Sequence, residues 1–172
     1  VVSSAASDVY KRQACNFLST PLLFYKGFMA LQIHRISNTL WLEKQPTIAL
    51  SLQALISRNY AIDIHPNAKI GYGVMLDHAT GIVIGETAVI DDNVSIMQSV
   101  TLGGTGKHSG DRHPKIRSNV LIGPSATILG NIEIGNGSLI GAASVVLESV
   151  PPRSIVAGAV SYTHLTLPTK QP

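Results

Sequence analysis

Residues 62–100 read IDIHPNAKIGYGVMLDHATGIVIGETAVIDDNVSIMQSV, and an aliphatic side chain returns at every sixth position of this stretch. A second series with the same spacing runs from residue 116 to residue 146. Neither an α-helix nor an alternating strand produces a strict period of six, whereas short strands wound into a β-helix of hexapeptide repeats do. The members of the two series are Ile64, Ile70, Leu76, Ile82, Ala88, Val94 and Val100, then Ile116, Ile122, Ile128, Ile134, Ile140 and Val146.

Glycines follow the repeated aliphatic residue in several repeats, namely Gly71, Gly123, Gly135 and Gly141. We expect a turn there that favours a residue without a Cβ atom. Three hexapeptides make one coil, so every third repeat should lie on the same side of the β-helix.

The two series are out of register with each other. Continuing the first beyond Val100 predicts an aliphatic residue at position 106, but the second begins at Ile116. The segment between them, GGTGKHSGDRHPK at 103–115, is rich in glycine and polar residues and has no side chains to fill a core. It is predicted to be a loop that leaves the β-helix, and long loops of this kind are usually functional.

Outside the repeats, the pattern changes twice. From Thr20 to about Asn59, apolar residues at three-residue and four-residue spacings predict two amphipathic helices, with Pro46 as the break between them. Residues 1–13 and 161–172 show no pattern related to a fold, and we expect both to be non-native tails. The expected organisation is therefore a helical segment at 14–60 and a β-helix at 61–160.

Composition narrows the functional classes. The chain has 172 residues, 45% of them hydrophobic and 13% charged, which excludes intrinsic disorder. The net charge of +3 without a dense basic cluster gives little support for nucleic-acid binding, and no apolar run approaches the roughly 20 residues that span a bilayer. The single cysteine, Cys15, forms no internal disulfide, so a reducing, cytoplasmic setting is expected.

One histidine stands out for chemistry. His78 follows an aliphatic position in LDHATG, and Asp63 lies almost three hexapeptides before it. Because three hexapeptides complete a coil, these two side chains would lie one coil apart and within possible contact. A carboxylate that holds one imidazole nitrogen leaves the other free to accept a proton, which makes a general-base dyad. On the residues alone, two ordinary polar turn residues are an equally good interpretation.

The loop contributes a second group of polar residues next to Gly103 and Gly104. Backbone N–H groups and cations in such a segment can surround a carboxylate or a phosphate. A solvated surface loop fits the same composition, and the GGTG stretch matches neither phosphate-loop nor dinucleotide fingerprints. The polar members are Lys107, His108, Asp111, Arg112 and His113.

Four longer stretches of the sequence point to a particular family. STPLLFYKGFMALQIHRI, DIHPNAKIGYGVMLDHATGIVIGETAVI, SIMQSVTLGGTGK and GDRHPKI together resemble the serine O-acetyltransferase family of hexapeptide-repeat acyltransferases. The resemblance runs from about Ala14 to Val160. It implies a mainly β fold, a left-handed parallel β-helix preceded by short α-helices, although crossovers between parallel strands are usually right-handed.

The resemblance also implies a reaction and a set of site residues. The reaction is acetyl transfer from acetyl-CoA to the hydroxyl of L-serine in cysteine biosynthesis, without a metal. His78 resembles the catalytic base and Asp63 its partner. The remaining matches are Asp77, Arg112 and His113 as contacts to the amino acid, and Gly104, Thr105 and Ala142 as positions along the acetyl-CoA groove.

Assembly follows from the same resemblance. The family forms homotrimers with active sites between neighbouring subunits, and its helical domain joins trimers into hexamers. From the resemblance we expect this chain to hold only the last helices of that domain, and Arg12 and Gln13 stand where the family has an Asp-Pro pair that closes the amino-acid pocket. The final segment, SYTHLTLPTKQP, lacks the terminal isoleucine that docks into O-acetylserine sulfhydrylase. We therefore expect a trimer without that complex, and no hexamer is predicted.

Two other functions fit parts of the pattern. A metal enzyme similar to the γ-class carbonic anhydrases would use three histidines, and His108 and His113 have a compatible spacing, with His78 as a third ligand. The second alternative is a non-catalytic trimeric module that binds CoA without turnover.

Overall fold

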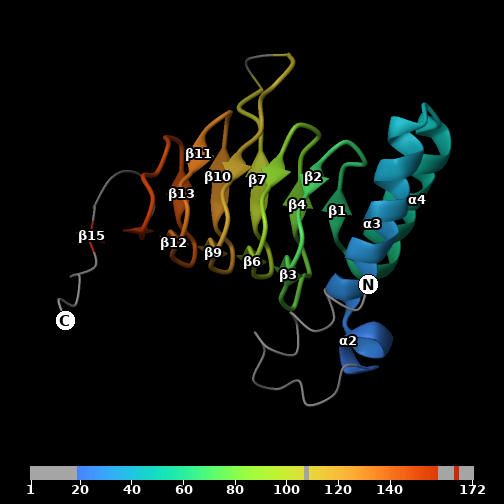
Figure 1. The fold of residues 1–172 in the computed structure, drawn as a ribbon, viewed down its shortest axis with the longest axis horizontal. Coiled ribbons are helices and arrows are strands. Elements are labelled where there is room, and N and C mark those ends of the chain that lie inside the picture. Colours follow the sequence, from blue (N-terminus) through green and yellow to red (C-terminus); the bar gives the residue numbers. More distant parts are fainter. Residues whose placement is uncertain (1–18, 107–108, 159–164, 167–172) are drawn as a thin grey trace.

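The computed structural model describes residues 19–106, 109–158 and 165–166. Very short strands follow one another around three faces, and each of the first strands pairs in parallel with the strand three places further along the chain. The result is a left-handed parallel β-helix with short helices at its N-terminal end (Figure 1). The expected fold class is confirmed.

The three faces of the β-helix are three sheets. Sheet A contains β1 (Asp63–Ile64), β4 (Val83–Ile84), β7 (Thr101–Gly103), β10 (Thr127–Leu129) and β13 (Val145–Val146). Sheet B contains β2 (Lys69–Ile70), β5 (Val89–Ile90), β8 (Lys115–Ile116) and β11 (Glu133–Ile134). Sheet C contains β3 (Met75–Leu76), β6 (Ser95–Ile96), β9 (Leu121–Ile122), β12 (Leu139–Ile140), β14 (Ser154–Val156) and the antiparallel β15 (Leu165–Thr166).

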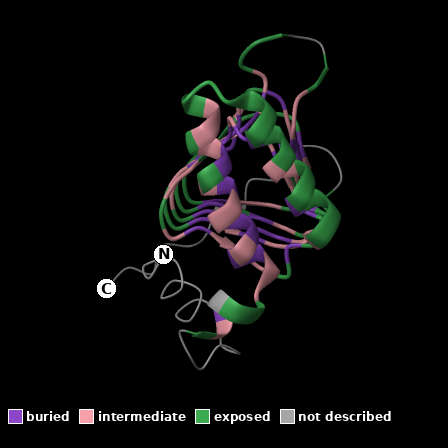
Figure 2. Ribbon diagram, turned by 90° about the vertical axis from the view of Figure 1, so that its right-hand side faces the viewer, coloured by how far each residue is buried: buried purple, intermediate pink, exposed green. Residues whose placement is uncertain are grey.

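The second residue of most strands points into the coil and forms the core. In β9, Ile122 is fully buried while its neighbour Leu121 is 42% exposed, because successive side chains of a strand lie on opposite faces. Figure 2 shows the same buried lining repeated from coil to coil. Stacking like residues above one another lets each coil bury the apolar face of the next.

The coils are not all of the expected length. Ile84 pairs with Leu102, which is the predicted distance of three hexapeptides, but Ile64 pairs with Ile84, so the first coil is longer. The extra length lies in the corner 77–82, between β3 and β4. The prediction that the aliphatic residues 64–100 occupy one kind of structural position is therefore wrong. Up to Leu76, the aliphatic series occupies inward-pointing strand positions, and from Ile82 it occupies corner positions. The series looks continuous in the sequence because aliphatic, buried residues occur at both kinds of position.

The predicted insertion is present. Ile90 pairs with Ile116, so the coil between them is much longer than three hexapeptides. The excess leaves the β-helix between β7 and β8, and Figure 1 shows it projecting beyond the stacked coils. The parallel register continues on both sides of the loop because the extra residues are confined to one corner.

The glycines after the aliphatic residues have a different cause from the one expected. A Cβ atom on Gly135 would lie 2.4 Å from the backbone nitrogen of Pro152, so the next coil leaves no room for a side chain. The left-handed turn positions belong instead to residues such as Asn93 and Asn119, with φ of 61° and 60°. Asparagine tolerates that conformation better than most residues.

Within the described residues, three helices precede the coils, where two were expected between Thr20 and about Asn59. They are α2 (Ser19–Phe24), α3 (Lys26–Leu42) and α4 (Pro46–Tyr60). The extra break falls at Tyr25, whose backbone is extended (φ −92°, ψ 108°). Pro46 begins α4, as predicted, because the first position of a helix needs no N–H donor. Within the described residues, no helix combines the length and apolar character needed to cross a membrane.

Helix α3 packs closely against the first coil (Figure 1). A Cβ atom on Gly27 would meet the carbonyl oxygen of Leu76 at 2.2 Å, so glycine permits this approach. Further along the helix, His34 is 2% exposed and hydrogen bonds to the backbone of Ala68. Burial lowers the pKa of His34 to about 4, so this imidazole is neutral in the fold and is part of the packing.

The buried His34 predicts a pH dependence of stability. Its pKa falls from 6.5 to about 4 on folding, so the unfolded chain binds the extra proton and stability falls as the pH drops from 6.5 towards 4. Between pH 7 and pH 5, we expect the wild type to lose about 2 kcal/mol more of its free energy of unfolding than His34→Gln. Urea denaturation at fixed protein concentration measures both losses, and equal losses would contradict the assignment.

Candidate functional site

The loop returns to the β-helix at the corner between sheets A and B. Its last residues lie over the corner 85–88 of the coil before it, because β8 pairs with β5. Arg112 Nη2 donates to Glu86 Oε2 at 2.7 Å, and its Nη1 donates to the carbonyl oxygen of Gly110 at 3.1 Å. Both side chains of the ion pair are about one-third exposed, so the guanidinium lies at the edge of the corner and remains accessible.

His113 lies beside Arg112 and is only 7% exposed. Its ring packs over Gly85, where a Cβ atom would lie 2.0 Å from Cδ2 and 2.1 Å from Nε2. The backbone N–H of Thr87 donates to His113 Nδ1 at 3.1 Å. Burial and the neighbouring Arg112 charge lower the pKa of His113, so a neutral imidazole and a cation lie side by side.

Lys115 connects the end of the loop to the β-helix. Lys115 Nζ pairs with Asp111 Oδ1 at 2.5 Å and donates to the carbonyl oxygens of Thr87 and His113 at 2.9 and 2.8 Å. These bonds join the returning strand to the corner beneath it. They fix the backbone of Arg112 and His113 although the loop before them is long.

His78 lies at a different corner, between sheets C and A. It occupies the expanded part of the first coil, and both His78 and Ala79 have left-handed backbones, with φ of 57° and 62°. Single left-handed residues recur at other corners, among them Ser99 and Ser125, but two in succession are found at this corner among the described residues. The His78 side chain is 57% exposed, and its Nε2 lies 3.7 Å from Asp77 Oδ2. The expanded corner therefore presents an imidazole to solvent, with a mostly buried carboxylate beside it.

Helix α3 supports this corner from behind. Lys26 Nζ hydrogen bonds to the hydroxyl of Thr80. A Cβ atom on Gly27 would lie 3.1 Å from the Cβ atom of Ala79, which is fully buried. The helix thus packs against the turn that holds His78.

Asp63 and His78 are not in contact in the described parts of this single chain. Asp63 begins β1 on sheet A, and its Oδ1 accepts a hydrogen bond from Gln53 Nε2 of α4 at 2.6 Å. The His78 imidazole lies 3.7 Å from the Asp77 carboxylate instead. The Asp63–His78 dyad stays a prediction.

The three positions predicted along the acetyl-CoA groove divide between the two corners. Gly104 lies against Arg112, whose Cγ would be 3.3 Å from a Cβ atom there, and Thr105 is exposed beside Gly130. Ala142 is exposed at the corner between sheets C and A, in a later coil than His78. The extended stretch 82–85 separates the two corners, a span of roughly 13 Å at about 3.3 Å per residue.

Sequence reasoning missed Glu86 and Thr87, which orient Arg112 and His113. Both belong to the GETA corner of the preceding coil, and nothing in their local sequence separates them from other polar turn residues. The register across the insertion, in which Ile90 pairs with Ile116, is the signal that would have placed them under the loop base. Gln53 was missed for a similar reason, because a helix residue meets Asp63 through tertiary packing.

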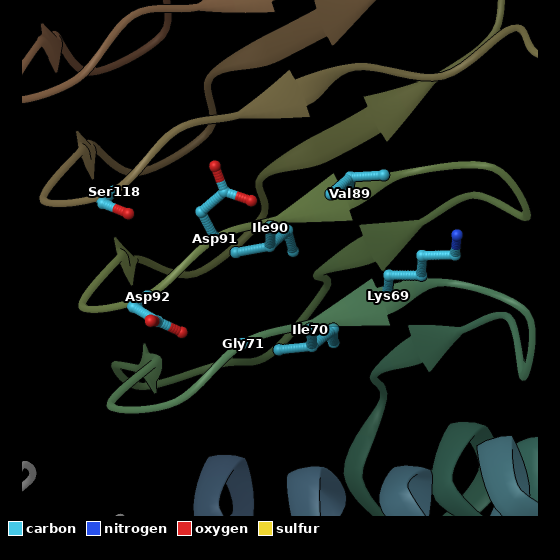
Figure 3. Close-up of a pocket in the computed structure, with 8 residues that line it drawn as sticks. All are labelled: Lys69, Ile70, Gly71, Val89, Ile90, Asp91, Asp92 and Ser118. Carbon is cyan, nitrogen blue, oxygen red and sulfur yellow. The ribbon is translucent and has the colours of Figure 1, made fainter.

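A depression of about 330 Å³ lies on sheet B (Figure 3). None of the predicted site residues lines it. Asp91, which does, is bonded by Arg117 at 3.5 Å. The lining residues are Lys69, Ile70, Gly71, Val89, Ile90, Asp91, Asp92 and Ser118.

The alternative metal site would need three histidines at one place. His78 and His113 lie at different corners, and His108 lies outside the described residues. Among residues 19–106, 109–158 and 165–166, no group of three His, Cys, Asp or Glu side chains is placed to hold a metal ion. Residues Arg12 and Gln13 also lie outside the described part of the chain.

The repeating coils define a hexapeptide-repeat protein. In agreement, residues 113–148 match the family model described as bacterial transferase hexapeptide (six repeats). A serine acetyltransferase from Salmonella typhimurium is 59% identical over 162 residues, which cover 92% of this chain and 59% of that relative. The chain thus spans about three fifths of the length of this curated relative.

Solved structures give the same answer. Serine acetyltransferase from Brucella abortus in complex with coenzyme A has a TM-score of 0.93 at 49% identity, covering 95% of this chain and 65% of that one. Soybean serine acetyltransferase complexed with serine has a TM-score of 0.88 at 52% identity, covering 96% of this chain and 67% of that one. The chain belongs to the serine acetyltransferase family.

Close packing over Gly85 predicts the effect of adding a methyl group there. In Gly85→Ala, the new Cβ atom forces the His113 ring out of its buried position, so the lowered pKa of His113 should rise towards 6.5. An NMR titration of the histidine ring protons measures this pKa. Gly141→Ala is the matched control, because its Cβ atom meets Ala157 at 3.2 Å and leaves His113 untouched. An unchanged His113 pKa in Gly85→Ala would contradict the packing.

Proposed function

We propose that this chain transfers the acetyl group of acetyl-CoA to the hydroxyl of L-serine, giving O-acetylserine and CoA for cysteine biosynthesis. The main support is the paired Arg112 and His113 at the loop base, in a chain 52% identical to a relative solved with serine and 49% identical to one solved with coenzyme A. Since Cys15 is the single cysteine, we place this reaction in a reducing, cytoplasmic setting.

His78 is the general base of the proposed reaction. Its exposed imidazole takes the proton of the serine hydroxyl while the hydroxyl oxygen attacks the thioester carbonyl carbon. The tetrahedral intermediate then collapses, the C–S bond breaks, and the imidazolium returns the proton to the CoA sulfur. Asp63 is the proposed partner that orients the imidazole, although in the single chain its carboxylate is bonded to Gln53.

The amino acid has two kinds of proposed contact. Arg112 supplies a fixed positive charge and His113 a neutral hydrogen-bond donor for the carboxylate of serine, and the carboxylate of Asp77 faces the amino group. Glu86 already holds one end of the guanidinium, which orients Arg112 before serine arrives. Because His113 is neutral, recognition of the serine carboxylate depends mainly on Arg112.

Acetyl-CoA is the proposed co-substrate, bound along Gly104, Thr105 and Ala142. Gly104 and Thr105 offer backbone groups at the start of the loop, and the exposed Ala142 leaves space at the corner beyond His78. No metal takes part in the proposed chemistry, because the attacking oxygen is activated by proton transfer to an imidazole.

The proposed assembly is a homotrimer. His78 and Asp77 at one corner are separated by the width of sheet A from the carboxylate contacts at the other, so one chain does not bring them to the same substrate molecule. A neighbouring copy that places its A–B corner against the C–A corner of the first would complete the site. Sites of this kind require closed, head-to-tail symmetry.

Replacing the base tests the reaction. We expect serine-dependent thiol release from acetyl-CoA to fall by about a hundredfold or more in His78→Ala. Asn93→Ala is the matched control, because it also puts alanine at a left-handed turn position, with φ of 61°, away from both corners. CoA binding without release by the wild type would instead indicate a non-catalytic CoA-binding module, and a tightly held metal ion in each subunit would favour the metal enzyme.

Mixing two inactive variants tests the shared site. His78→Ala and Arg112→Ala subunits each lack one half, but a trimer containing both has interfaces where an intact His78 meets an intact Arg112. Random co-assembly of equal amounts should restore about a quarter of the wild-type activity. A mixture no more active than the separate variants, although mass spectrometry shows hybrid trimers, would overturn the intersubunit site.

A further inference from the structure

Thr87 makes an unusual number of contacts to the base of the loop. Its hydroxyl oxygen accepts hydrogen bonds from the backbone N–H groups of Arg112 and His113, at 3.0 and 3.1 Å. The same oxygen lies 2.8 Å from Nδ1 of His113, and the carbonyl oxygen of Thr87 accepts from Lys115 at 2.9 Å. One threonine therefore holds the backbone of both proposed serine contacts and one of their side chains.

The hydrogen bonds of Thr87 assign the proton on His113. The backbone N–H of Thr87 points at Nδ1 from 3.1 Å, and a backbone amide can only donate. Nδ1 must therefore offer its lone pair, which leaves the single proton of the neutral ring on Nε2. The threonine hydroxyl lies 2.8 Å from the same nitrogen, but its single proton can go either to Nδ1 or to the carboxylate of Asp111, so the assignment rests on the backbone N–H group.

The opposite edge of the ring is the one left for a ligand. Nε2 lies over Gly85, whose missing side chain leaves room for it. Among the described residues, both hydrogen-bond contacts of the ring are to Nδ1, and none is to Nε2. The buried side-chain nitrogen and oxygen atoms without a partner do not include Nε2. An Nε2–H group in this position is a donor that a substrate oxygen can meet.

The charges around His113 also affect its protonation. Burial, then Arg112, Lys115 and His65, lower the pKa of His113 and disfavour its doubly protonated form, whereas Glu86 favours that form. Asp111 also faces this group, since it hydrogen bonds to Thr87 and pairs with Lys115. If Nδ1 were protonated, two hydrogen-bond donors would face each other, and the hydrogen bond from the Thr87 N–H group to Nδ1 would be lost.

We propose that Thr87 is a positioning residue that holds His113 as the Nε2–H tautomer, so that His113 donates a hydrogen bond to the serine carboxylate and does not serve as a second base. This inference rests on the proposed function for the identity of the ligand. Proton abstraction then belongs to His78 alone. Loss of the Thr87 hydroxyl weakens serine binding and leaves the chemical step and acetyl-CoA binding in place.

The tautomer is tested first, on the unmodified protein. Two-bond ¹H–¹⁵N correlation spectra of the ¹⁵N-labelled wild-type chain distinguish the two imidazole nitrogens, with the His113 signals assigned by their loss in His113→Gln. A pyridine-type Nδ1 and a protonated Nε2 at pH 7.5 are expected. A protonated Nδ1 overturns the proposal, and this measurement requires neither activity nor a folded Thr87 variant.

Kinetics then separate positioning from a general structural effect. In Thr87→Val, KM for serine should rise about tenfold, because a displaced His113 loses its single hydrogen bond to the serine carboxylate, about 1.4 kcal/mol. KM for acetyl-CoA and kcat should stay within about twofold of wild type. Thr87→Ser keeps the hydroxyl and should restore KM. Thr39→Val is the control, since its hydroxyl bonds the carbonyl oxygen of Arg35 on an exposed helix surface.

The outcomes distinguish this inference from the function on which it rests. An unchanged serine KM in Thr87→Val, or a failure of Thr87→Ser to restore it, overturns the positioning role. A wild-type chain with no serine-dependent thiol release overturns the proposed function, and the tautomer of His113 is still decided by the spectra.

Discussion

Parallel stacking of one coil on the next is the constraint on which the rest of the molecule depends. The strands are very short and find their partners in neighbouring coils, so register must be kept from one coil to the next. Buried aliphatic side chains keep it, because a shift of one residue would turn every one of them to the outside. Extra residues can therefore leave only at the corners, and the two largest departures, at 77–82 and after β7, are where the candidate chemistry lies.

The two corners are prepared in different ways. At the first, an expanded turn with two left-handed residues holds His78 out into solvent, with α3 packed behind it. At the second, a long loop is fastened at its base by Glu86, Thr87 and Lys115, so that Arg112 and His113 are fixed although the segment before them is not part of a strand. The β-helix thus holds both the expanded turn and the base of the loop in place. Neither segment needs a hydrophobic core of its own.

The proposed reaction divides the work between these corners. The exposed imidazole handles the proton, while the neutral His113 and charged Arg112 recognise the amino acid. Burial and nearby cations keep His113 neutral, whereas His78 is exposed to solvent. Two histidines of one chain can therefore have separate roles because their surroundings differ, in the way that environment assigns acid and base roles elsewhere. Their separation by the width of a sheet is the physical reason for proposing a second subunit.

The sequence by itself determined the coil architecture, the position of the insertion and the residues worth considering, because a buried position in every repeat leaves a period that no helix or simple strand produces. It did not reveal that the aliphatic series changes from strand to corner positions at Ile82, since Ile, Leu, Val and Ala suit both. It also gave no sign of the break at Tyr25 or of the bond from Gln53 to Asp63. Only the tertiary structure decided that Glu86 and Thr87 lie beneath Arg112 and His113. That contact depends on the pairing of β5 with β8 across the insertion, and distance along the chain does not encode which corner a long loop returns to.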